Sequence, residues 1–273
     1  MPADAKITVR NVGKTFRTGR GGVHALDGLD FTVGEGEFVA IVGPSGCGKS
    51  TLLNILTGFD RPDTGEALVD DRPVEGPGRK GVLITQHGSV FPWMTVQRNL
   101  VFGVNGMPEE ERERLSRHYV DMVGLQGFEQ SFPRELSGGM LQRVEVARAL
   151  MAKPDVLYMD EPFGALDALT RLRMREEMLR ILQRDRHTCL LVTHDVEEAL
   201  HLADRILVLT PRPGRVQRIV DVDVEHPRRM SSLRLIALKE LVLRELGLTP
   251  EGESAEGAVT ADTLAIPCDR CAV

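Results

Sequence analysis

One segment near the N-terminus restricts the fold of this chain more than any other feature. Residues Gly43 to Ser50 are GPSGCGKS, which matches the pattern G-x-x-x-x-G-K-[ST]. The apolar stretch Glu37 to Val42 before it predicts a buried strand, and Lys49 to about Thr57 predicts a helix. A strand, a glycine-rich turn and a helix in this order form an arrangement that holds phosphate groups. The sequence therefore predicts an α/β protein that binds a nucleoside triphosphate.

Each residue type in this segment suits phosphate binding for a physical reason. Glycines let the backbone bend so that successive N–H groups point at phosphate oxygens, and the helix N-terminus adds partial positive charge. Lys49 offers a full charge to the β- and γ-phosphates, and Ser50 a hydroxyl ligand for Mg²⁺. An accidental glycine-rich turn is the alternative, but the flanking strand and helix argue against it. The expected nucleotide-binding residues here are Gly43, Pro44, Ser45, Gly46, Cys47, Gly48, Lys49, Ser50 and Thr51.

Two carboxylates follow a later apolar segment. Asp155 to Met159 predicts a core strand, and Asp160 and Glu161 come directly after it. Because ligands of open α/β sheets bind at the carboxyl ends of the strands, Asp160 is well placed for a Mg²⁺ shell. Glu161 points elsewhere and can polarise an attacking water. A solvated Asp-Glu turn is the alternative, but the position downstream of the phosphate-binding segment favours a metal and water site.

The rest of the chain predicts three parts. Strand-like and helix-like segments alternate, which indicates a largely parallel sheet with an antiparallel flank near the N-terminus. Residues 1–230 are expected to form an ATPase domain, into which a helical subdomain of about residues 87–153 is inserted. An amphipathic helix over 231–248 and a flexible tail over 249–273 follow. The remaining expected strands are Ile7 to Val9, Leu29 to Val33, Gly81 to Thr85, Thr188 to Thr193 and Arg205 to Thr210, and the expected helices include Glu109 to Val123 and Ser137 to Met151.

Composition excludes several classes of protein. The formal net charge is −6, so no overall basic field draws the chain to nucleic acid. No apolar run approaches the roughly 20 residues of a membrane span, and the N-terminus lacks the apolar core of a signal peptide. The chain has four cysteines, too few for a disulfide framework, which agrees with a reducing cytoplasm.

A further motif stands upstream of the carboxylates. Leu136 to Met140 is LSGGM and precedes a helix that carries Gln142, Arg143 and Arg148. It resembles the signature of ABC ATPases, in which LSGGQ is commoner, so Met140 departs from the usual glutamine. A serine-capped helix start is the alternative. The resemblance implies a P-loop NTPase fold with a RecA-like core, an antiparallel β flank and an inserted helical subdomain, with ATP and Mg²⁺ as cofactors.

The same resemblance implies a dimer. Ser137, Gly138 and Gly139 at a helix N-terminus form a second anion site, yet ATP needs both sites on one γ-phosphate. In ABC ATPases two chains pair head to tail, and each ATP lies between one phosphate-binding loop and the partner's signature. A second ATP-binding subunit, identical or related, is therefore an expected partner.

Other positions match the family one by one. Gln86 resembles the Q-loop glutamine, which touches Mg²⁺ and water, and His194 resembles the switch histidine that senses the γ-phosphate. Phe16 resembles the aromatic residue that stacks on adenine, although an aromatic near an early strand is often only core. Ala165-Leu166-Asp167 resembles the D-loop at the dimer interface. The expected catalytic residues are Glu161, His194, Gln86 and Lys49, and the expected metal ligands are Ser50, Gln86 and Asp160.

One stretch resembles a particular group of importers. Phe91 to Val96 is FPWMTV, similar to the L-P-W-x-T-V of the nitrate, sulfonate and taurine group, and Pro213 to Val216 also looks like that group. We interpret the region around Trp93 as a contact for a membrane subunit, although a core tryptophan is the alternative. The implied partners are transmembrane permease subunits and, indirectly, a solute-binding protein, with the chain at the cytoplasmic face of the membrane.

Two other functions and one weaker site stay open at this point. A soluble ABC ATPase without a transport role is one alternative, but no coiled-coil or zinc insertion of the kind such proteins carry is visible. A module that binds ATP without turnover is another, against which Lys49, Glu161 and His194 argue. Cys268 and Cys271 have the spacing of half a zinc site, although incidental cysteines in a tail are the simpler interpretation.

Overall fold

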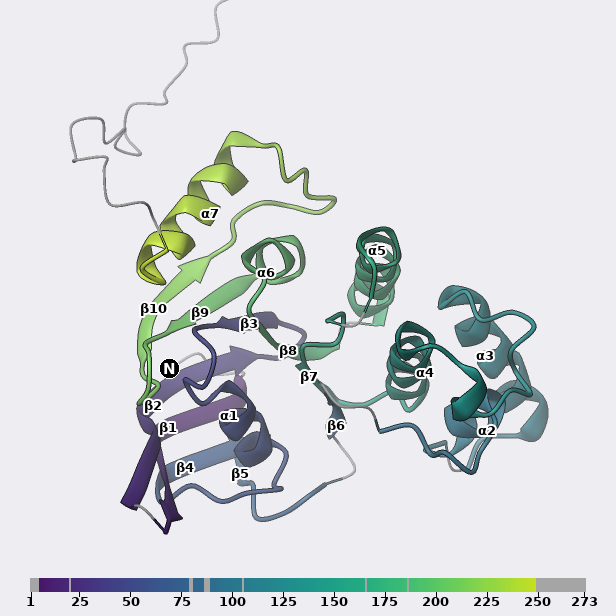
Figure 1. The fold of residues 1–273 in the computed structure, drawn as a ribbon, viewed down its shortest axis with the longest axis horizontal. Helices are drawn as coiled ribbons and strands as arrows, with labels where there is room; N and C mark the ends of the chain where they lie inside the picture. The colour runs from purple at the N-terminus through teal and green to yellow at the C-terminus, as the bar shows by residue number, and fades with distance from the viewer. Residues whose placement is uncertain are drawn as a thin grey trace, which may run out of the picture.

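The fold is built on two sheets that meet in a shared apolar cluster. A computed structural model describes residues 5–19, 21–78, 81–85, 89–104, 106–164, 166–185 and 187–248. The larger sheet has the strand order β10-β9-β3-β8-β7-β6 and the smaller one the order β2-β1-β4-β5 (Figure 1). The strands of the larger sheet are β3 (Phe38–Val42), β6 (Gly81–Ile84), β7 (Val156–Asp160), β8 (Thr188–Thr193), β9 (Arg205–Leu209) and β10 (Val216–Asp221).

The larger sheet is parallel except at one edge. β3 pairs in parallel with β8 and β9, and β7 pairs in parallel with β8 and β6, whereas β10 is antiparallel to β9. β3 and β8 are buried along their whole length. A parallel sheet is covered on both faces, which explains why these strands are continuous apolar runs rather than alternating ones.

Alternate side chains of the central strand enter two different clusters. Val39 and Ile41 pack with α1 and the smaller sheet, whereas Phe38, Ala40 and Val42 pack with the helices of the opposite face. This division follows from the two-residue period of a strand. The helices are α1 (Lys49–Leu56), α2 (Val96–Val101), α3 (Glu109–Met122), α4 (Gly138–Met151), α5 (Ala168–Asp185), α6 (Val196–Leu202) and α7 (Leu233–Glu245), with a 3₁₀ turn at Pro133–Glu135.

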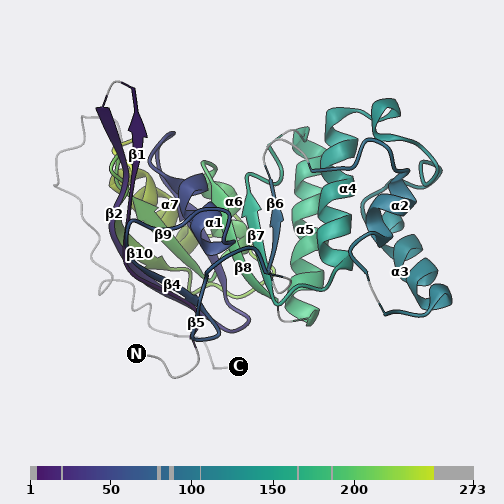
Figure 2. The same ribbon diagram turned by 90° about the horizontal axis from the view of Figure 1, so that it is seen from below.

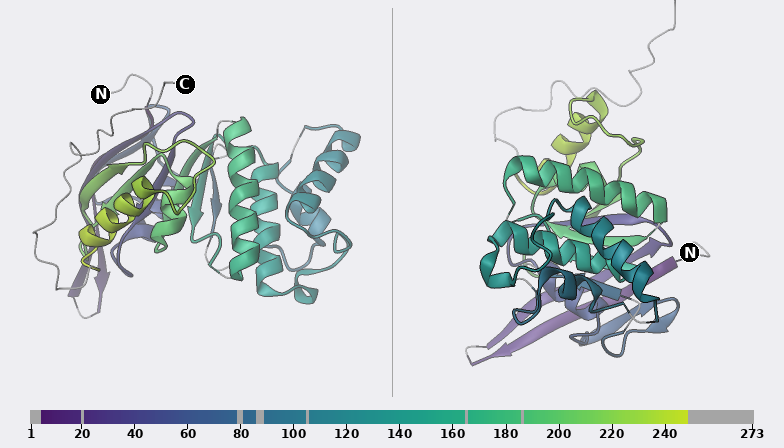
Figure 3. Two further views of the ribbon diagram at one scale, coloured as in Figure 1. Left: turned by 90° about the horizontal axis from the view of Figure 1, so that it is seen from above. Right: turned by 90° about the vertical axis from the view of Figure 1, so that its right-hand side faces the viewer.

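The helices that follow β6 lie apart from the sheets. α2, α3 and α4 gather at the side of the molecule beyond the edge strand β6, and both views place them far from β1 and β2 (Figures 1 and 2). α5 lies between this group and the sheet, and α7 lies over β10 at the opposite side (Figure 3). Within the described ranges, no helix is both long and apolar enough to span a bilayer.

The strands expected in the larger sheet are confirmed to within one residue at each end. The smaller sheet is longer than predicted, because β1 (Ala5–Thr18) and β2 (Gly21–Gly34) form one long antiparallel pair that continues into β4 (Thr64–Val69) and β5 (Arg72–Pro73). Register shifts interrupt the pairing of β1 with β2, and Asn11 has a φ of 47°. Such bulges break the alternation of apolar residues that predicts a strand from sequence.

Candidate active site

The loop before α1 opens into a cavity of about 400 Å³. Gly46 and Gly48 have φ values of 76° and 104°, in the left-handed region that favours glycine. A Cβ on Gly48 would lie 2.8 Å from the carbonyl oxygen of Ala25, so a side chain has no room there. The first turn of α1 contains no acidic residue. The helix N-terminus therefore presents its N–H groups to the cavity without a competing carboxylate.

Lys49 is held inside this loop. Its Nζ donates hydrogen bonds to the carbonyl oxygens of Gly43, at 2.8 Å, and Pro44, at 3.0 Å. Burial raises the pKa of the neighbouring Cys47 thiol, although the positive charge of Lys49 acts in the opposite direction. The loop thus places one ammonium group beside the helix N-terminus, where both attract an anion.

The other walls of the cavity come from distant parts of the chain. Phe16 and Val23 line it from β1 and β2, and Arg212 lines it from the loop after β9. Phe16 is 40% exposed, so the alternative of a core aromatic is wrong. Arg212 was not predicted; the signal that could have found it is its position after the carboxyl end of a parallel strand. The lining residues are Phe16, Val23, Ala25, Ser45, Gly46, Gly48, Lys49, Ser50, Thr51, Asp160, Glu161 and Arg212.

The two carboxylates at the end of β7 both line the cavity. Asp160 is the last residue of the strand, and Glu161 has a φ of 51°, so the chain turns sharply between them. The N–H of Glu161 donates to the carbonyl oxygen of Val192 on the adjacent strand, at 2.9 Å. Asp160 and Ser50 both line the cavity, and oxygen donors of this kind fit Mg²⁺. A positive φ at a glutamate is strained backbone of the kind that concentrates at functional sites.

Glu161 and His194 lie together. Nδ1 of His194 is 2.9 Å from Oε1 of Glu161. Because a carboxylate can only accept, the ring donates through Nδ1–H. The contact exists because β7 and β8 are adjacent parallel strands, which end at the same edge of the sheet. The sequence predicted a role for each of these two residues but not the contact between them, which only the tertiary structure reveals.

A buried ion cluster lies behind His194. Arg175 of α5 donates to Oδ2 of Asp195, at 2.7 Å, and its Nε is 3.6 Å from Oε1 of Glu198. Burial acts to raise the pKa of Asp195, but the hydrogen bonds from Arg175 and from backbone N–H groups outweigh it and hold that pKa below its ordinary value. Burial also raises the pKa of Glu198. Asp195 caps α6 directly after His194, so this cluster fixes the segment that carries the histidine.

We expect the replacement Arg175→Met to lower the free energy of unfolding by about 3 kcal/mol, because it leaves the buried Glu198 without its cation. The side chains of Arg175 and Glu198 are only 7% and 4% exposed. Arg180→Met is the matched control, since Arg180 forms an exposed ion pair with Glu177 on the same helix. The control should change the free energy by less than about 1 kcal/mol. Urea denaturation of both variants measures the difference; equal losses would contradict the prediction.

The signature residues lie away from the nucleotide cavity of their own chain. Ser137 caps α4 by accepting a hydrogen bond from the N–H of Met140, and Ser137 and Gly138 are exposed. None of Ser137, Gly138 or Gly139 is among the described residues that line the cavity. α4 lies on the far side of β6 and β7 from α1 (Figures 1 and 2). The structure thus leaves two anion-binding helix starts apart within one chain.

α4 nevertheless contacts the site through its buried side. Gln142 donates to the carbonyl oxygen of Glu161, at 3.3 Å. Glu145 accepts from the backbone N–H of Ser89, and Arg148 donates to the carbonyl oxygen of Ser89, at 2.8 Å. Glu145 was missed because a carboxylate within an apolar stripe gives no local signal. Gln86, Ala165, Cys268 and Cys271 lie outside the described residues, as does the expected tail.

Known proteins are similar to this chain over most of its length. A family model described as ABC transporter matches residues 26–164. An uncharacterized ABC transporter ATP-binding protein of Methanocaldococcus jannaschii is 44% identical over 243 residues, 88% of this chain and 91% of that protein. A nitrate import ATP-binding protein of Synechocystis is 46% identical over 85% of this chain and 88% of its own length. An aliphatic sulfonates import ATP-binding protein of Bacillus thuringiensis is 38% identical over 88% of this chain and 95% of its own length.

A solved structure shows the same fold. It is a dimeric ATP-binding cassette in a post-hydrolysis state with ADP and phosphate bound. It matches with a TM-score of 0.72 and 32% identity, over 80% of this chain and 100% of that one. The matched residues of the family model include both the loop before α1 and the carboxylates at the end of β7.

Proposed function

This chain belongs to the family of ABC transporter ATP-binding proteins, which are ATPases, and on this premise we propose that it powers the import of a small solute through separate membrane subunits. The observation that supports turnover is the cavity that brings Lys49, Asp160 and Glu161 together. His194 contacts Glu161 at its edge. A module that only binds ATP has no need of a histidine that orients a glutamate.

The proposed chemistry assigns a task to each side chain. Lys49 and the N–H groups of the loop hold the phosphates, and Phe16 stacks on the base. Glu161 accepts a hydrogen bond from the attacking water and orients it toward the γ-phosphate, while His194 holds the carboxylate in place. Ser50 and Asp160 would hold Mg²⁺, which would supply positive charge to the phosphates. Charge stabilisation by fixed groups outweighs proton transfer in this scheme.

The proposed active unit is a dimer with shared sites. Ser137, Gly138 and Gly139 cannot complete the cavity of their own chain without crossing the sheet, since α4 lies beyond β6. In a head-to-tail pair, the partner's α4 N-terminus brings the second set of N–H groups to the γ-phosphate. The structural relative described as dimeric, with ADP and phosphate bound, supports this arrangement.

An exposed aromatic group marks the proposed contact with the membrane subunit. The ring of Phe91 lies 5.4 Å from that of Trp93 and 4.5 Å from that of Phe102. Trp93 is 66% exposed, so the alternative of a core tryptophan is wrong. The buried Asn99 holds this loop, because its side chain bonds the carbonyl oxygens of Phe91, Met94 and Thr95. A rigid, exposed aromatic cluster is suited to anchor a partner.

We expect Trp93→Ala to leave nucleotide binding and basal hydrolysis unchanged and to reduce transport at least about tenfold, the scale of losing one aromatic anchor at an interface. Co-purification with the permease and uptake in vesicles measure the two effects. Phe128→Ala is the matched control, since Phe128 is also an exposed aromatic side chain. If Trp93→Ala assembles and transports normally, this surface does not receive the permease.

The proposed solute is a small anion or zwitterion of the nitrate, sulfonate or taurine kind, and the proposed location is the cytoplasmic face of the membrane. Support comes from the FPWMTV stretch and from relatives named for nitrate and sulfonate import. The cassette selects a solute only through the permease that it fits, so the test uses the partners. The chain is expressed with its neighbouring permease and binding protein, and uptake of labelled nitrate, taurine and an alkanesulfonate is measured.

A matched strain carries the same proteins with Glu161→Gln in the cassette, which separates ATP-driven uptake from leakage. Uptake of one of the three anions only with the unchanged cassette supports the solute class. Uptake of a sugar, peptide or metal instead contradicts the solute class and leaves the ATPase assignment intact. ATP hydrolysis without uptake of any solute favours a soluble ATPase of the same family.

A further inference from the structure

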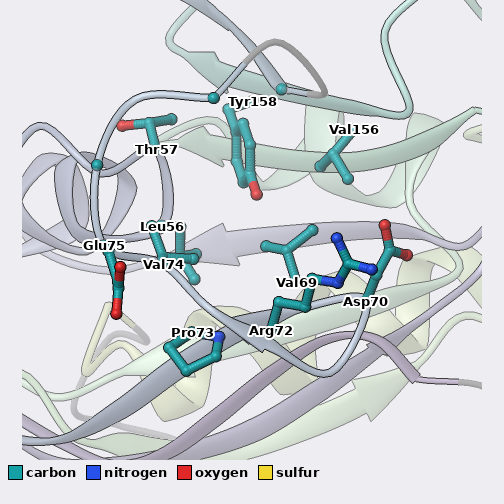
Figure 4. A pocket seen from close by; sticks show the side chains of 13 residues that line it. Leu56, Thr57, Val69, Asp70, Arg72, Pro73, Val74, Glu75, Val156 and Tyr158 are labelled. Carbon is teal, nitrogen blue, oxygen red and sulfur yellow. The ribbon is translucent and has the colours of Figure 1, made fainter.

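A second hollow lies at the far end of the elements that build the active site. Its volume is about 270 Å³, and it opens between the end of α1, the β4–β5 hairpin and the first half of β7. Leu56, Val69, Val74 and Val156 give it apolar walls, and the ring of Tyr158 stands in the same space (Figure 4). Among the described residues, those that line this hollow are all different from those that line the nucleotide cavity.

Two close approaches of glycine residues hold its walls in place. A Cβ on Gly58 would lie 2.3 Å from the carbonyl oxygen of Gly76, so the end of α1 and the loop after β5 touch directly. A Cβ on Gly81 would lie 2.8 Å from Cε2 of Tyr158, so the ring packs directly against β6. These contacts form the hollow before any ligand binds, so binding does not have to order its walls at a cost in free energy.

The hydroxyl of Tyr158 is the notable polar group of this hollow. The residue is 2% exposed, and among the described residues no hydrogen bond of its hydroxyl is seen; the hydroxyl points into the space in Figure 4. Because Tyr158 lines the hollow, its hydroxyl is a donor that a hydrogen-bond acceptor bound there can reach. Burial raises the pKa of this hydroxyl, and the charge of Asp70 raises it further, so it remains a donor at any physiological pH.

The charges at the mouth have both signs. Asp70 forms an ion pair with Lys6 at 2.7 Å, and Arg72 and Glu75 are exposed at the rim. This mixture favours neither an anion nor a cation. An apolar cavity of about 150 Å³ binds benzene. The larger hollow has room for one substituted ring, although it lies just below the size of typical drug sites.

From this geometry we propose that the hollow is a binding site for a small neutral ring compound, which accepts a hydrogen bond from Tyr158 through a carbonyl or ether oxygen. The ligand lies between β7 and α1. Tyr158 and Asp160 share one face of β7, and α1 begins at Lys49 and ends beside the hollow at Leu56. A ligand in the hollow would therefore contact β7 and α1, two elements that carry residues of the active site, as a regulatory ligand does.

The test uses two probes of the same shape, acetophenone and α-methylstyrene, in which a carbonyl oxygen is replaced by a methylene group. Their binding to the nucleotide-free chain is measured by ligand-observed NMR titration. We expect both to bind the unchanged chain, acetophenone more tightly. Tyr158→Phe should weaken acetophenone about fivefold, the scale of one hydrogen bond, and change α-methylstyrene less than twofold.

Two further variants locate the probe. Val74→Trp fills the hollow and should abolish binding of both probes, while a fluorescent ATP analogue still binds and shows that the chain is folded. Phe16→Ala removes the aromatic wall of the nucleotide cavity and should leave both probes bound. Failure of acetophenone to bind the unchanged chain, equal losses of both probes in Tyr158→Phe, or loss of binding in Phe16→Ala instead of Val74→Trp would each overturn the proposal. These binding measurements stand apart from ATP hydrolysis and transport.

Discussion

Replacing Glu161 with glutamine is expected to leave ATP binding intact and to slow hydrolysis at least about 100-fold, the usual scale for the loss of a general base. The amide keeps the size of the side chain but is a weaker acceptor for the attacking water. Its amide nitrogen also places a second donor against Nδ1–H of His194, which lies 2.9 Å from Oε1 in the unchanged chain. Both effects act on the transition state, so the loss should appear in kcat.

The control for this experiment is Glu197→Gln. Glu197 lies three positions after His194, is exposed and pairs with Lys239. The control should hydrolyse ATP at nearly the normal rate, and both variants should bind a fluorescent ATP analogue with the affinity of the unchanged chain. Near-normal turnover by purified Glu161→Gln would show that another residue positions the water.

The second large effect is complementation between two inactive chains. Lys49→Ala removes the cation of the phosphate loop, and Ser137→Arg blocks the α4 N-terminus with a bulky side chain. Each variant alone should lose at least about 100-fold in activity, because each removes charge stabilisation from the site. In a mixed head-to-tail dimer, one site carries both changes and the other carries neither.

Equal mixing should therefore restore about a quarter of the normal activity, since half of randomly formed dimers are mixed and each has one intact site. The recovery should depend on protein concentration, because it requires association. A mixture of Lys49→Ala with Glu161→Gln is the control. Both changes lie in one cavity, so each site of their mixed dimer carries a lesion. No recovery with Ser137→Arg, or an active monomer by light scattering, contradicts the shared site.

The strands that carry chemistry could be predicted from sequence because their signals are local. The segment from Glu37 to Ser50 contains an apolar strand, glycines and a helix start close together in the sequence. The same is true of the apolar segment before Asp160. The requirements for a tight turn of the backbone and for groups that bind phosphate are met within this short segment, so they appear as a pattern in the sequence.

α5 and the buried ion cluster show the opposite case. The core face of α5 is formed by Met174, Met178, Leu179 and Leu182, which stand among many charged neighbours and give a weak helical signal. Arg175 on the same helix looks like any surface arginine in the sequence. Its contact with Asp195 exists only because α5 packs beside the end of β8.

The sequence by itself determined the phosphate-binding loop, the two carboxylates, the parallel core and, by resemblance, the family. The tertiary structure alone decided that His194 contacts Glu161, that Arg175 secures the segment behind it, and that Arg212 and Phe16 wall the same cavity. It also decided that the α4 N-terminus stands away from that cavity. The reason is physical: a motif records what neighbouring residues do to one backbone, whereas strand order and helix packing set which distant side chains meet.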